Sequence, residues 1–487
     1  MIALYPDQIH SLNGVVAAMR ANYRKIMLRL PTGGGKTVIA ARIARGAREK
    51  GKRVCFAVDS ITLVDQTVDR FREFGVTEIG VIQADHPLTD RDQPVQVASI
   101  QSLARRKMSQ YHFDIVIIDE AHCVYESVVK WMDDWNAVTF LGLSATPWTK
   151  GLGKHWDVLV EGSTVAEMIE SGRLCKYRMF APSHPDLKGV KVSKGDYDVN
   201  QLSDRMTKGA LVADMTKHWR EHALGLPTLA FCVDRVHAQY VQQQFLSEGV
   251  PCGYIDAYTP RDEREEIGRA LACGELSVVS SVGCLTKGVD WDVRCILLAR
   301  PTKSDMLYMQ IIGRGLRIAK GKEYCLILDH SDTALRLGLP EDVEAKYDRL
   351  DDGTPKKSAR NEDEEPLPKK CGSCGFVKPP KVHACPSCGF APTKQHEVDE
   401  VQADLKEIKR KKHEMTPGQR GRFYAELKGY AEERGFKPGW AANQYRERFG
   451  IWPNKYRDVV PVAPSPETRS WCKSRIIRYA HRRRATA

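Results

Sequence analysis

Apolar residues in the first two thirds of the chain gather into short runs that are separated by amphipathic stretches. Five runs occupy residues 25–30, 53–58, 95–100, 113–119 and 140–145, and five more occupy residues 227–233, 251–256, 276–282, 294–300 and 324–330. Continuous apolar runs of this length are typical of strands that are buried on both faces. Because helix-like stretches lie between most of them, the pattern predicts an α/β fold with two parallel sheets covered by helices.

The succession of runs is interrupted once and ends before the last quarter of the chain. Residues 160–215 are less regular, which places a domain boundary near 160–175. Residues 351–370 are polar and acidic, as expected of a linker, and a cysteine-rich segment and a basic region with helical periodicity follow. The predicted parts are a first domain at 1–165, a second at 166–340, a linker at 341–370, the cysteine-rich segment at 371–390 and the basic region at 391–487.

Length and composition narrow the class of protein. At 487 residues the chain is too long for one ordinary core. It has no apolar stretch near the roughly 18 residues of a membrane span, and its N-terminus lacks signal-peptide features, so we expect a cytoplasmic protein with no membrane partner. The net charge of +12 suggests a polyanionic partner. Ten of the 14 cysteines are scattered singly and are expected to be small buried apolar residues.

A glycine-rich turn follows the first apolar run and precedes an amphipathic stretch. Such a turn lets backbone N–H groups surround phosphate oxygens, and a following Lys and Thr can reach the phosphates and Mg²⁺. The general pattern has Gly six residues before the Lys, where this chain has Leu30. The residues expected to hold the nucleotide and its Mg²⁺ here are Thr32, Gly33, Gly34, Gly35, Lys36 and Thr37.

Two carboxylates, Asp119 and Glu120, end the apolar run at 113–119. Carboxylates are rarely buried without a partner. In a nucleotide-binding sheet the ligand lies beyond the carboxyl ends of the strands, so Asp119 can hold Mg²⁺ there. Glu120 can then orient and deprotonate the attacking water.

Five motifs in this order give the chain a resemblance to the superfamily 2 helicases of the DEAD/DEAH type, in particular the restriction-subunit and repair type of bacteria and phages. They are PTGGGKT (31–37), DEAH (119–122), SATP (144–147), KGVD (287–290) and QIIGRGLR (310–317). The resemblance covers about residues 1–335. It implies two tandem RecA-like domains that close on ATP and Mg²⁺ while nucleic acid is held across both.

The resemblance also implies roles for individual residues. Gln8 would read the adenine, Gly288 and Asp290 would face the nucleotide between the domains, and Arg314 and Arg317 would act as arginine fingers. A guanidinium suits the charge that develops on a transferred phosphoryl group. The residues that would couple hydrolysis to domain motion are His122, Ser144, Thr146 and Gln310, and those that would contact nucleic acid are Gln66, Ser99, Gln101 and Thr286. The alternatives are local packing for His122 and a surface or phosphate-contacting role for Arg314.

The remaining cysteines form two pairs, Cys371 with Cys374 and Cys385 with Cys388. Four thiolates at this spacing suit tetrahedral Zn²⁺ in a zinc ribbon. His383 is an alternative ligand, and a redox dithiol pair is the alternative function. Farther on, the basic C-terminal region carries Trp471 and Tyr479 among its cations, which suits nucleic acid, with a solvated tail as the alternative.

Together these features predict an ATP-dependent DNA helicase or translocase that unwinds or remodels branched DNA in replication, recombination or repair. An RNA helicase stays open because the core motifs do not separate RNA from DNA. The motor subunit of a restriction system and a DNA-dependent ATPase switch without unwinding also stay open.

Overall fold

The computed structural model describes most of residues 4–354 and 415–475. Between these two stretches only residues 369–370, 377–378, 384, 389–391 and 407–408 are described. The gaps within the two stretches are residues 62, 84–85, 107–110, 182–184, 194, 208, 286–290, 416, 438, 466, 470 and 474. The chain divides into two compact units, Met1–Lys409 and Arg410–Ala487, which are described separately below.

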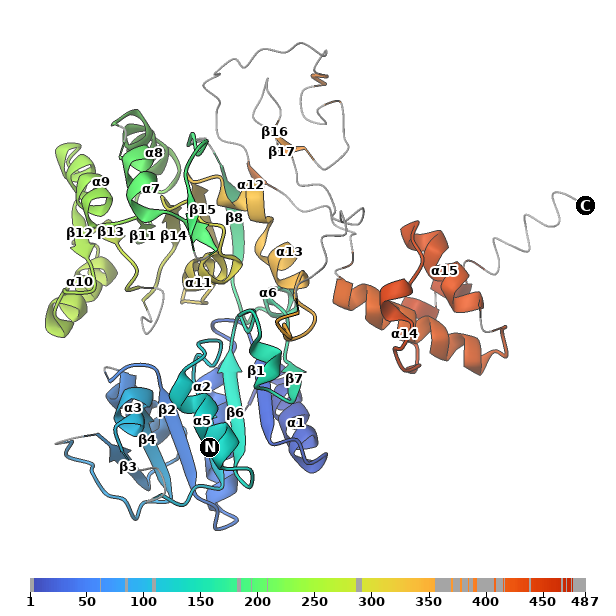
Figure 1. The fold of residues 1–487 in the computed structure, drawn as a ribbon. Helices are drawn as coiled ribbons and strands as arrows, with labels where there is room; N and C mark the ends of the chain where they lie inside the picture. The colour runs from blue at the N-terminus through green and yellow to red at the C-terminus, as the bar shows by residue number, and fades with distance from the viewer. Residues whose placement is uncertain are drawn as a thin grey trace, which may run out of the picture. The chain divides into compact units, whose positions relative to one another are not determined.

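The first sheet has seven strands, all parallel, in the order β3-β4-β2-β5-β6-β1-β7 (Figure 1). Its strands are β1 (Lys25–Arg29), β2 (Val54–Val58), β3 (Ile79–Ile82), β4 (Val95–Ser99), β5 (Ile115–Ile118), β6 (Thr139–Ser144) and β7 (Val158–Glu161). The five apolar runs predicted between residues 25 and 145 are all strands, whereas β3 and β7 were not predicted. The central strands are buried along their length because a core lies on each face of the sheet.

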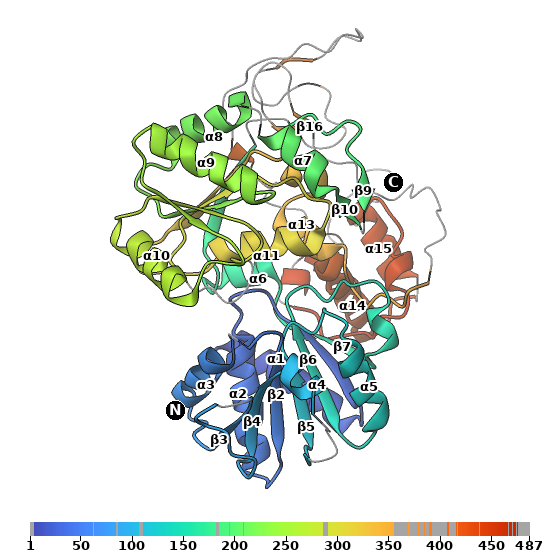
Figure 2. The ribbon, with the colours of Figure 1, turned by 60° about the vertical axis from the view of Figure 1, so that its left-hand side comes forward.

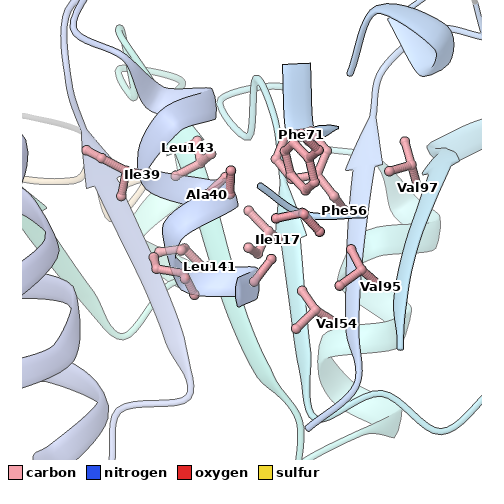
Figure 3. Close-up of a cluster of buried hydrophobic side chains, with 14 of the residues drawn as sticks. Ile39, Ala40, Val54, Phe56, Phe71, Val95, Val97, Ile117, Leu141 and Leu143 are labelled. Carbon is pink, nitrogen blue, oxygen red and sulfur yellow. The ribbon is translucent and has the colours of Figure 1, made fainter. Parts of the chain in front are cut away.

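One face of this sheet packs against α1 (Pro6–Arg20), α2 (Lys36–Arg48) and α3 (Leu63–Glu73). Figure 3 shows the centre of this core, where side chains of α2 and α3 meet those of the strands. The opposite face packs against α4 (Ile100–Ala104) and α5 (Glu126–Asp134). The two cores fix the carboxyl ends of the strands, from which the glycine loop and the two carboxylates project.

The second sheet has the order β12-β13-β11-β14-β15-β8-β18, and every pair is parallel except β8 with β18. Its strands are β8 (Lys176–Phe180), β11 (Thr228–Phe231), β12 (Cys252–Ile255), β13 (Val278–Ser281), β14 (Cys295–Leu298), β15 (Tyr324–Asp329) and β18 (Glu407–Ile408). The predicted fold class, an α/β protein with two tandem RecA-like parallel sheets, is therefore confirmed.

Helices cover both faces of the second sheet too. The helices α7 (Val199–Met206), α8 (Gly209–His222) and α9 (Arg235–Ser247) contribute to one core. The other core contains residues of α6 (Val165–Glu170), α10 (Arg261–Cys273), α11 (Asp305–Gly315), α12 (Thr333–Leu337) and α13 (Pro340–Ala345). In both views α6 and α11 lie at the end of this domain that is nearest the first sheet (Figures 1 and 2).

The prediction that residues 160–215 are less regular is wrong for much of that region. It holds α6, β8, α7, the start of α8 and a short hairpin of β9 (Val192–Ser193) and β10 (Asp196–Tyr197). These elements lack a clear apolar period because β8 pairs with only a two-residue strand on its outer side and the hairpin is largely exposed. Their place in the fold comes from packing on the second sheet.

The second unit contains α14 (Pro417–Glu433), α15 (Trp440–Phe449) and the short helix η3 (Asn454–Tyr456). Aromatic side chains dominate its core, among them Tyr430 and Tyr445, which are fully buried. Trp471 packs on this core beside Phe423. In the sequence it lies among cations, a pattern that suits a contact with nucleic acid. Tyr479 lies outside the described residues.

Several expectations from composition can be compared with the fold. Seven of the ten single cysteines are buried, as predicted: Cys55, Cys175, Cys232, Cys252, Cys295, Cys325 and Cys472. The prediction is wrong for Cys123 and Cys284, which are half-buried, and for Cys273, which is exposed. Within the described part of the chain, no helix combines the length and the apolar character that crossing a membrane would require. The cytoplasmic location stays a prediction. The four paired cysteines and His383 lie outside the described residues.

Candidate nucleotide site

The glycine loop connects β1 to the start of α2. Gly33 and Gly35 have φ angles of 87° and 88°, a left-handed conformation that favours glycine. A Cβ on Gly34 would lie 2.6 Å from the Leu30 side chain, so this position also requires glycine. Leu30 is fully buried in the first core, which gives a packing reason for an apolar residue where the general pattern has Gly.

Gln8 and Lys36 both lie against this loop. The Gln8 side-chain amide donates to the Gly34 carbonyl oxygen (3.3 Å), and its own oxygen accepts from the Tyr5 N–H (3.1 Å). The Lys36 ammonium donates to the Leu30 carbonyl oxygen (3.3 Å). The residue expected to read the adenine and the residue expected to reach the phosphates therefore flank the same turn.

Asp119 and Glu120 lie directly beyond the carboxyl end of β5. Glu120 has a φ angle of 48°, which is rare for a residue with a Cβ and is a kind of strain that gathers at functional sites. Burial and the charge of Glu120 raise the pKa of Asp119 to about 6, while Lys36 opposes the shift. Burial lowers the pKa of Lys36, and both carboxylates oppose that shift. The three charged groups thus share one poorly solvated site.

His122 connects this site to the second domain. Its Nδ1 lies 3.0 Å from the Ser144 hydroxyl and 3.2 Å from a Glu120 carboxylate oxygen. Its Nε2 lies 3.4 Å from the side-chain nitrogen of Gln310 on α11. The Ser144 hydroxyl also accepts from the Thr146 N–H (3.1 Å). The four residues expected to couple hydrolysis to domain motion therefore form one chain of contacts.

Helix α11 lies directly on the glycine loop. A Cβ on Gly313 would be 2.8 Å from Thr32, and a Cβ on Gly33 would be 3.8 Å from the Arg317 side chain. Arg314 is buried in the same turn of the helix. The charges of Arg314 and Arg317 also contribute to the lowered pKa of Lys36, so both arginines approach the lysine that is expected to reach the phosphates.

Two of the four residues expected to contact nucleic acid lie at the surface. Gln66 on α3 and Gln101 on α4 are exposed. Ser99 is fully buried, and its hydroxyl accepts from the Ser102 N–H (3.0 Å) as the cap of α4. Its contact with nucleic acid stays a prediction. Thr286 lies outside the described residues, as do Gly288 and Asp290, which are expected to face the nucleotide.

Two family models match the chain. Residues 1–149 match "Type III restriction enzyme, res subunit", and residues 210–319 match "Helicase conserved C-terminal domain". The first model covers β1 to β6 of the first sheet, and the second covers β11 to β14 of the second sheet. Together they contain the five motifs described above. The chain belongs to the superfamily 2 helicases.

Individual relatives agree with this membership. The helicase is 27% identical over 412 residues to a 51.5 kDa protein of a Lactococcus phage (isolate 7-9), which covers 82% of this chain and 86% of the phage protein. It is 30% identical over 349 residues to a Saccharomyces cerevisiae protein assigned as the ATP-dependent helicase IRC3. That match covers 66% of this chain and only 50% of the yeast protein, so the chain spans half the length of this relative.

A solved structure supports the fold. The structure titled "ATP-dependent Type ISP restriction-modification enzyme LlaBIII bound to DNA" superimposes with a TM-score of 0.51 at 17% sequence identity. The match covers 67% of this chain and 28% of the other chain.

One contact of the site was not predicted from the sequence of this helicase. The Thr149 hydroxyl donates to the His122 carbonyl oxygen (2.6 Å) and lies 3.8 Å from the Met306 sulfur of α11. Thr149 is two residues beyond the SATP motif, and nothing in its immediate sequence marks it. Only the folded loop brings it beside His122.

The pKa of His122 gives a prediction about stability. Burial alone would lower this pKa, but contacts with Cys123 and Glu120 raise it to about 9. The folded state then holds a proton that the unfolded state releases above its ordinary pKa of about 6.5, so this stabilisation is complete below pH 6.5 and is lost as pH rises through 9. Between pH 6.5 and 9.5 we expect the melting temperature to fall about 2–4 °C more for the wild type than for His122→Gln. If the melting temperatures of the two proteins change in parallel with pH, the pKa of His122 is not raised in the folded state.

Proposed function

We propose that this protein is an ATP-dependent DNA helicase or translocase that couples ATP hydrolysis to the unwinding or remodelling of branched DNA in replication, recombination or repair. The observation that carries the proposal is the contact of α11 with the glycine loop, together with the His122–Gln310 contact across the same gap. A site assembled from two sheet domains changes when the domains open or close. ATP turnover at this site would therefore move the two domains relative to each other.

In this proposal each residue of the site has a chemical role. Lys36 binds the terminal phosphates, and Glu120 accepts the proton of the attacking water. Arg314 and Arg317 stabilise the negative charge that develops on the transferred phosphoryl group.

Mg²⁺ would be held by the Thr37 hydroxyl and the Asp119 carboxylate, and it supplies charge neutralisation of the phosphates. The donor chemistry fits, because both are oxygen ligands and Asp119 lies at the carboxyl end of β5, next to Glu120. A bound cation would also offset the burial that raises the pKa of Asp119.

The charge distribution supports a nucleic-acid partner and gives the second unit a role in binding it. Residues 410–487 contain 19 Lys and Arg against 7 Asp and Glu. Their net charge of +12 equals that of the whole chain, so residues 1–409 are neutral overall. A cationic unit attached to a neutral motor would supply most of the salt-dependent attraction to a polyanion. DNA is chosen because the relatives include a structure that is titled as bound to DNA.

An exposed aromatic residue suggests where a strand would lie on the second unit. Trp452 is 45% exposed, and the Arg446 guanidinium covers its ring at 4.6 Å. Ile451 beside it is 51% exposed. A cation stacked on an exposed indole is suited to a phosphate backbone with an unpaired base, in contrast to Trp471, which packs on the core.

The choice of substrate is tested by the steady-state ATPase rate of the full chain without nucleic acid and with single-stranded, duplex or forked DNA, or RNA. We expect forked or duplex DNA to raise kcat about tenfold or more and Lys36→Ala to abolish turnover in every condition while leaving DNA binding intact. Stimulation by RNA alone would replace DNA with RNA in the proposal. Turnover by Lys36→Ala would refute the assignment of the glycine loop.

The strand site on the second unit predicts a local loss of affinity. Trp452→Ala should weaken binding of single-stranded DNA about tenfold, the effect of losing one stacked base. Arg446→Gln should weaken binding and reduce the slope of log affinity against log salt concentration by about one. Val460→Ala is a matched control, because Val460 is another exposed apolar residue of the same unit. Equal affinities of Trp452→Ala and Val460→Ala in fluorescence anisotropy would rule out this site.

The cysteine-rich segment is proposed to hold one Zn²⁺ through Cys371, Cys374, Cys385 and Cys388, which form a donor set of four thiolates. The strands that flank the first pair in sequence, β16 (Lys369–Lys370) and β17 (Val377–Lys378), pair antiparallel, as expected of a ribbon.

Elemental analysis of the purified chain should give about one zinc per molecule, and Cys371→Ser with Cys385→Ser should remove it. Cys273→Ser, which changes an exposed single cysteine, should leave the zinc content unchanged. A wild-type protein purified without chelators and free of zinc would exclude the ribbon.

A further inference from the structure

Residues 346–354 follow α13 and form a strap that runs from the second domain back to the first. α13 packs beside α11 and α6, and the side chain of Val343 is buried in the second core. In both views α13 lies next to α11 (Figures 1 and 2). The start of the strap is thus fixed to the helix that carries Gln310 and Arg314.

The other end of the strap is bonded to the first domain. The Asp351 carboxylate accepts from the Gly151 N–H (2.8 Å), and the Asp351 carbonyl oxygen accepts from the Gly153 N–H (2.7 Å). The Tyr347 carbonyl oxygen accepts from the buried guanidinium of Arg29 at the end of β1. These bonds attach the strap to the strand that leads into the glycine loop and to the loop that follows the SATP motif.

The middle of the strap connects both domains through one side chain. The Tyr347 ring stacks on Trp148 with centroids 4.2 Å apart and planes 7° apart. Its hydroxyl donates to the Asp305 carboxylate (2.8 Å), and Lys346 lies 3.4 Å from the same carboxylate. Asp305 is the first residue of α11, and Trp148 is the residue after the SATP motif. Tyr347 therefore bridges the motif that contacts His122 and the helix that contacts the glycine loop.

We infer that Tyr347 is a positioning residue for ATP hydrolysis, because the strap sets where α11, and with it Arg314, lies on the glycine loop. Trp148 packs in the second core together with α11. Without the Tyr347 hydroxyl, α11 would keep this packing but lose one of the bonds that set its position relative to Ser144 and the glycine loop. The inference rests on the proposed hydrolysis at this site. It does not depend on whether the stimulating nucleic acid is DNA or RNA.

The test is a double-mutant cycle of Tyr347→Phe and Asp305→Asn, read out as the kcat and KM of ATP turnover by the full chain. Tyr347→Phe keeps the stack on Trp148 and removes the hydrogen bond. We expect kcat to fall about fivefold, which is in the range of the net contribution of one intramolecular hydrogen bond. The KM for ATP and the affinity for a fluorescent ATP analogue should change less than twofold, because Gln8 and Lys36 are untouched. The double variant should be no worse than the poorer single variant.

Tyr177→Phe is the matched control. Its hydroxyl donates to the Glu341 carboxylate on α13 (2.6 Å), so the variant also removes a tyrosine–carboxylate bond in the second domain but leaves Asp305 untouched. We expect its kcat to stay within twofold of the wild type. Tyr347→Ala, which also removes the stack, should lower kcat more than Tyr347→Phe does.

The possible outcomes distinguish a failure of the inference about Tyr347 from a failure of the proposed function. If the wild type hydrolyses ATP and Tyr347→Phe keeps its kcat within twofold, the inference is wrong. The same conclusion holds if KM rises in step with any loss of kcat, or if Tyr177→Phe loses as much. Should Tyr347→Ala fail to fold in a thermal melt, Tyr347→Phe alone decides. A wild type that binds ATP without turnover, with or without nucleic acid, would overturn the proposed function as well.

Discussion

The close approach of α11 to the glycine loop is the constraint on which the site depends. The two segments come from different domains, and Gly313 of α11 leaves no Cβ against Thr32 of the loop. Leu174, which precedes β8 in the second domain, approaches Gly33 of the same loop just as closely. A methyl group at either position would need neighbouring atoms to move, since its carbon would lie 3.0 Å or less from the facing side chain. Because of this packing, arginines of the second domain reach a lysine of the first. A movement of either domain therefore changes the contacts of the other at this site.

The same approach explains the balance of charges in the site. Lys36, Asp119 and Glu120 are poorly solvated, and the lysine and the carboxylates shift one another's protonation in the direction that keeps opposite charges together. His122 is drawn into this group by Glu120 and touches the second domain through Gln310. A polyanionic ligand entering here would meet cations from both domains. Such an arrangement favours a closed state when phosphates are present and weakens that preference when they leave.

Local patterns in the sequence were sufficient to predict the central strands and the motifs that are contiguous in the chain. Buried central strands appear as apolar runs, and the glycine loop and Asp119–Glu120 are contiguous in the chain, so their chemistry could be predicted. β8 and the hairpin β9–β10 were missed because edge and exposed strands carry no continuous apolar signal. The capping role of Ser99 was not predicted, because a serine that caps a helix and one that faces a ligand look alike in sequence. The Trp148–Tyr347 stack joins residues about 200 positions apart, and only tertiary packing reveals such pairs.

The two-residue strand β18 protects an edge of the second sheet. β8 would otherwise end the sheet with a row of unpaired N–H and C=O groups beside Met179 and Phe180, and Glu407 and Ile408 pair with these two residues. Uncovered edges of this kind recruit strands from other molecules. A proteolytic cut anywhere between 355 and 406 would therefore leave a motor whose second sheet is no longer capped by its own covalently linked chain. Self-association through β8 would compete with folding and solubility in such a fragment.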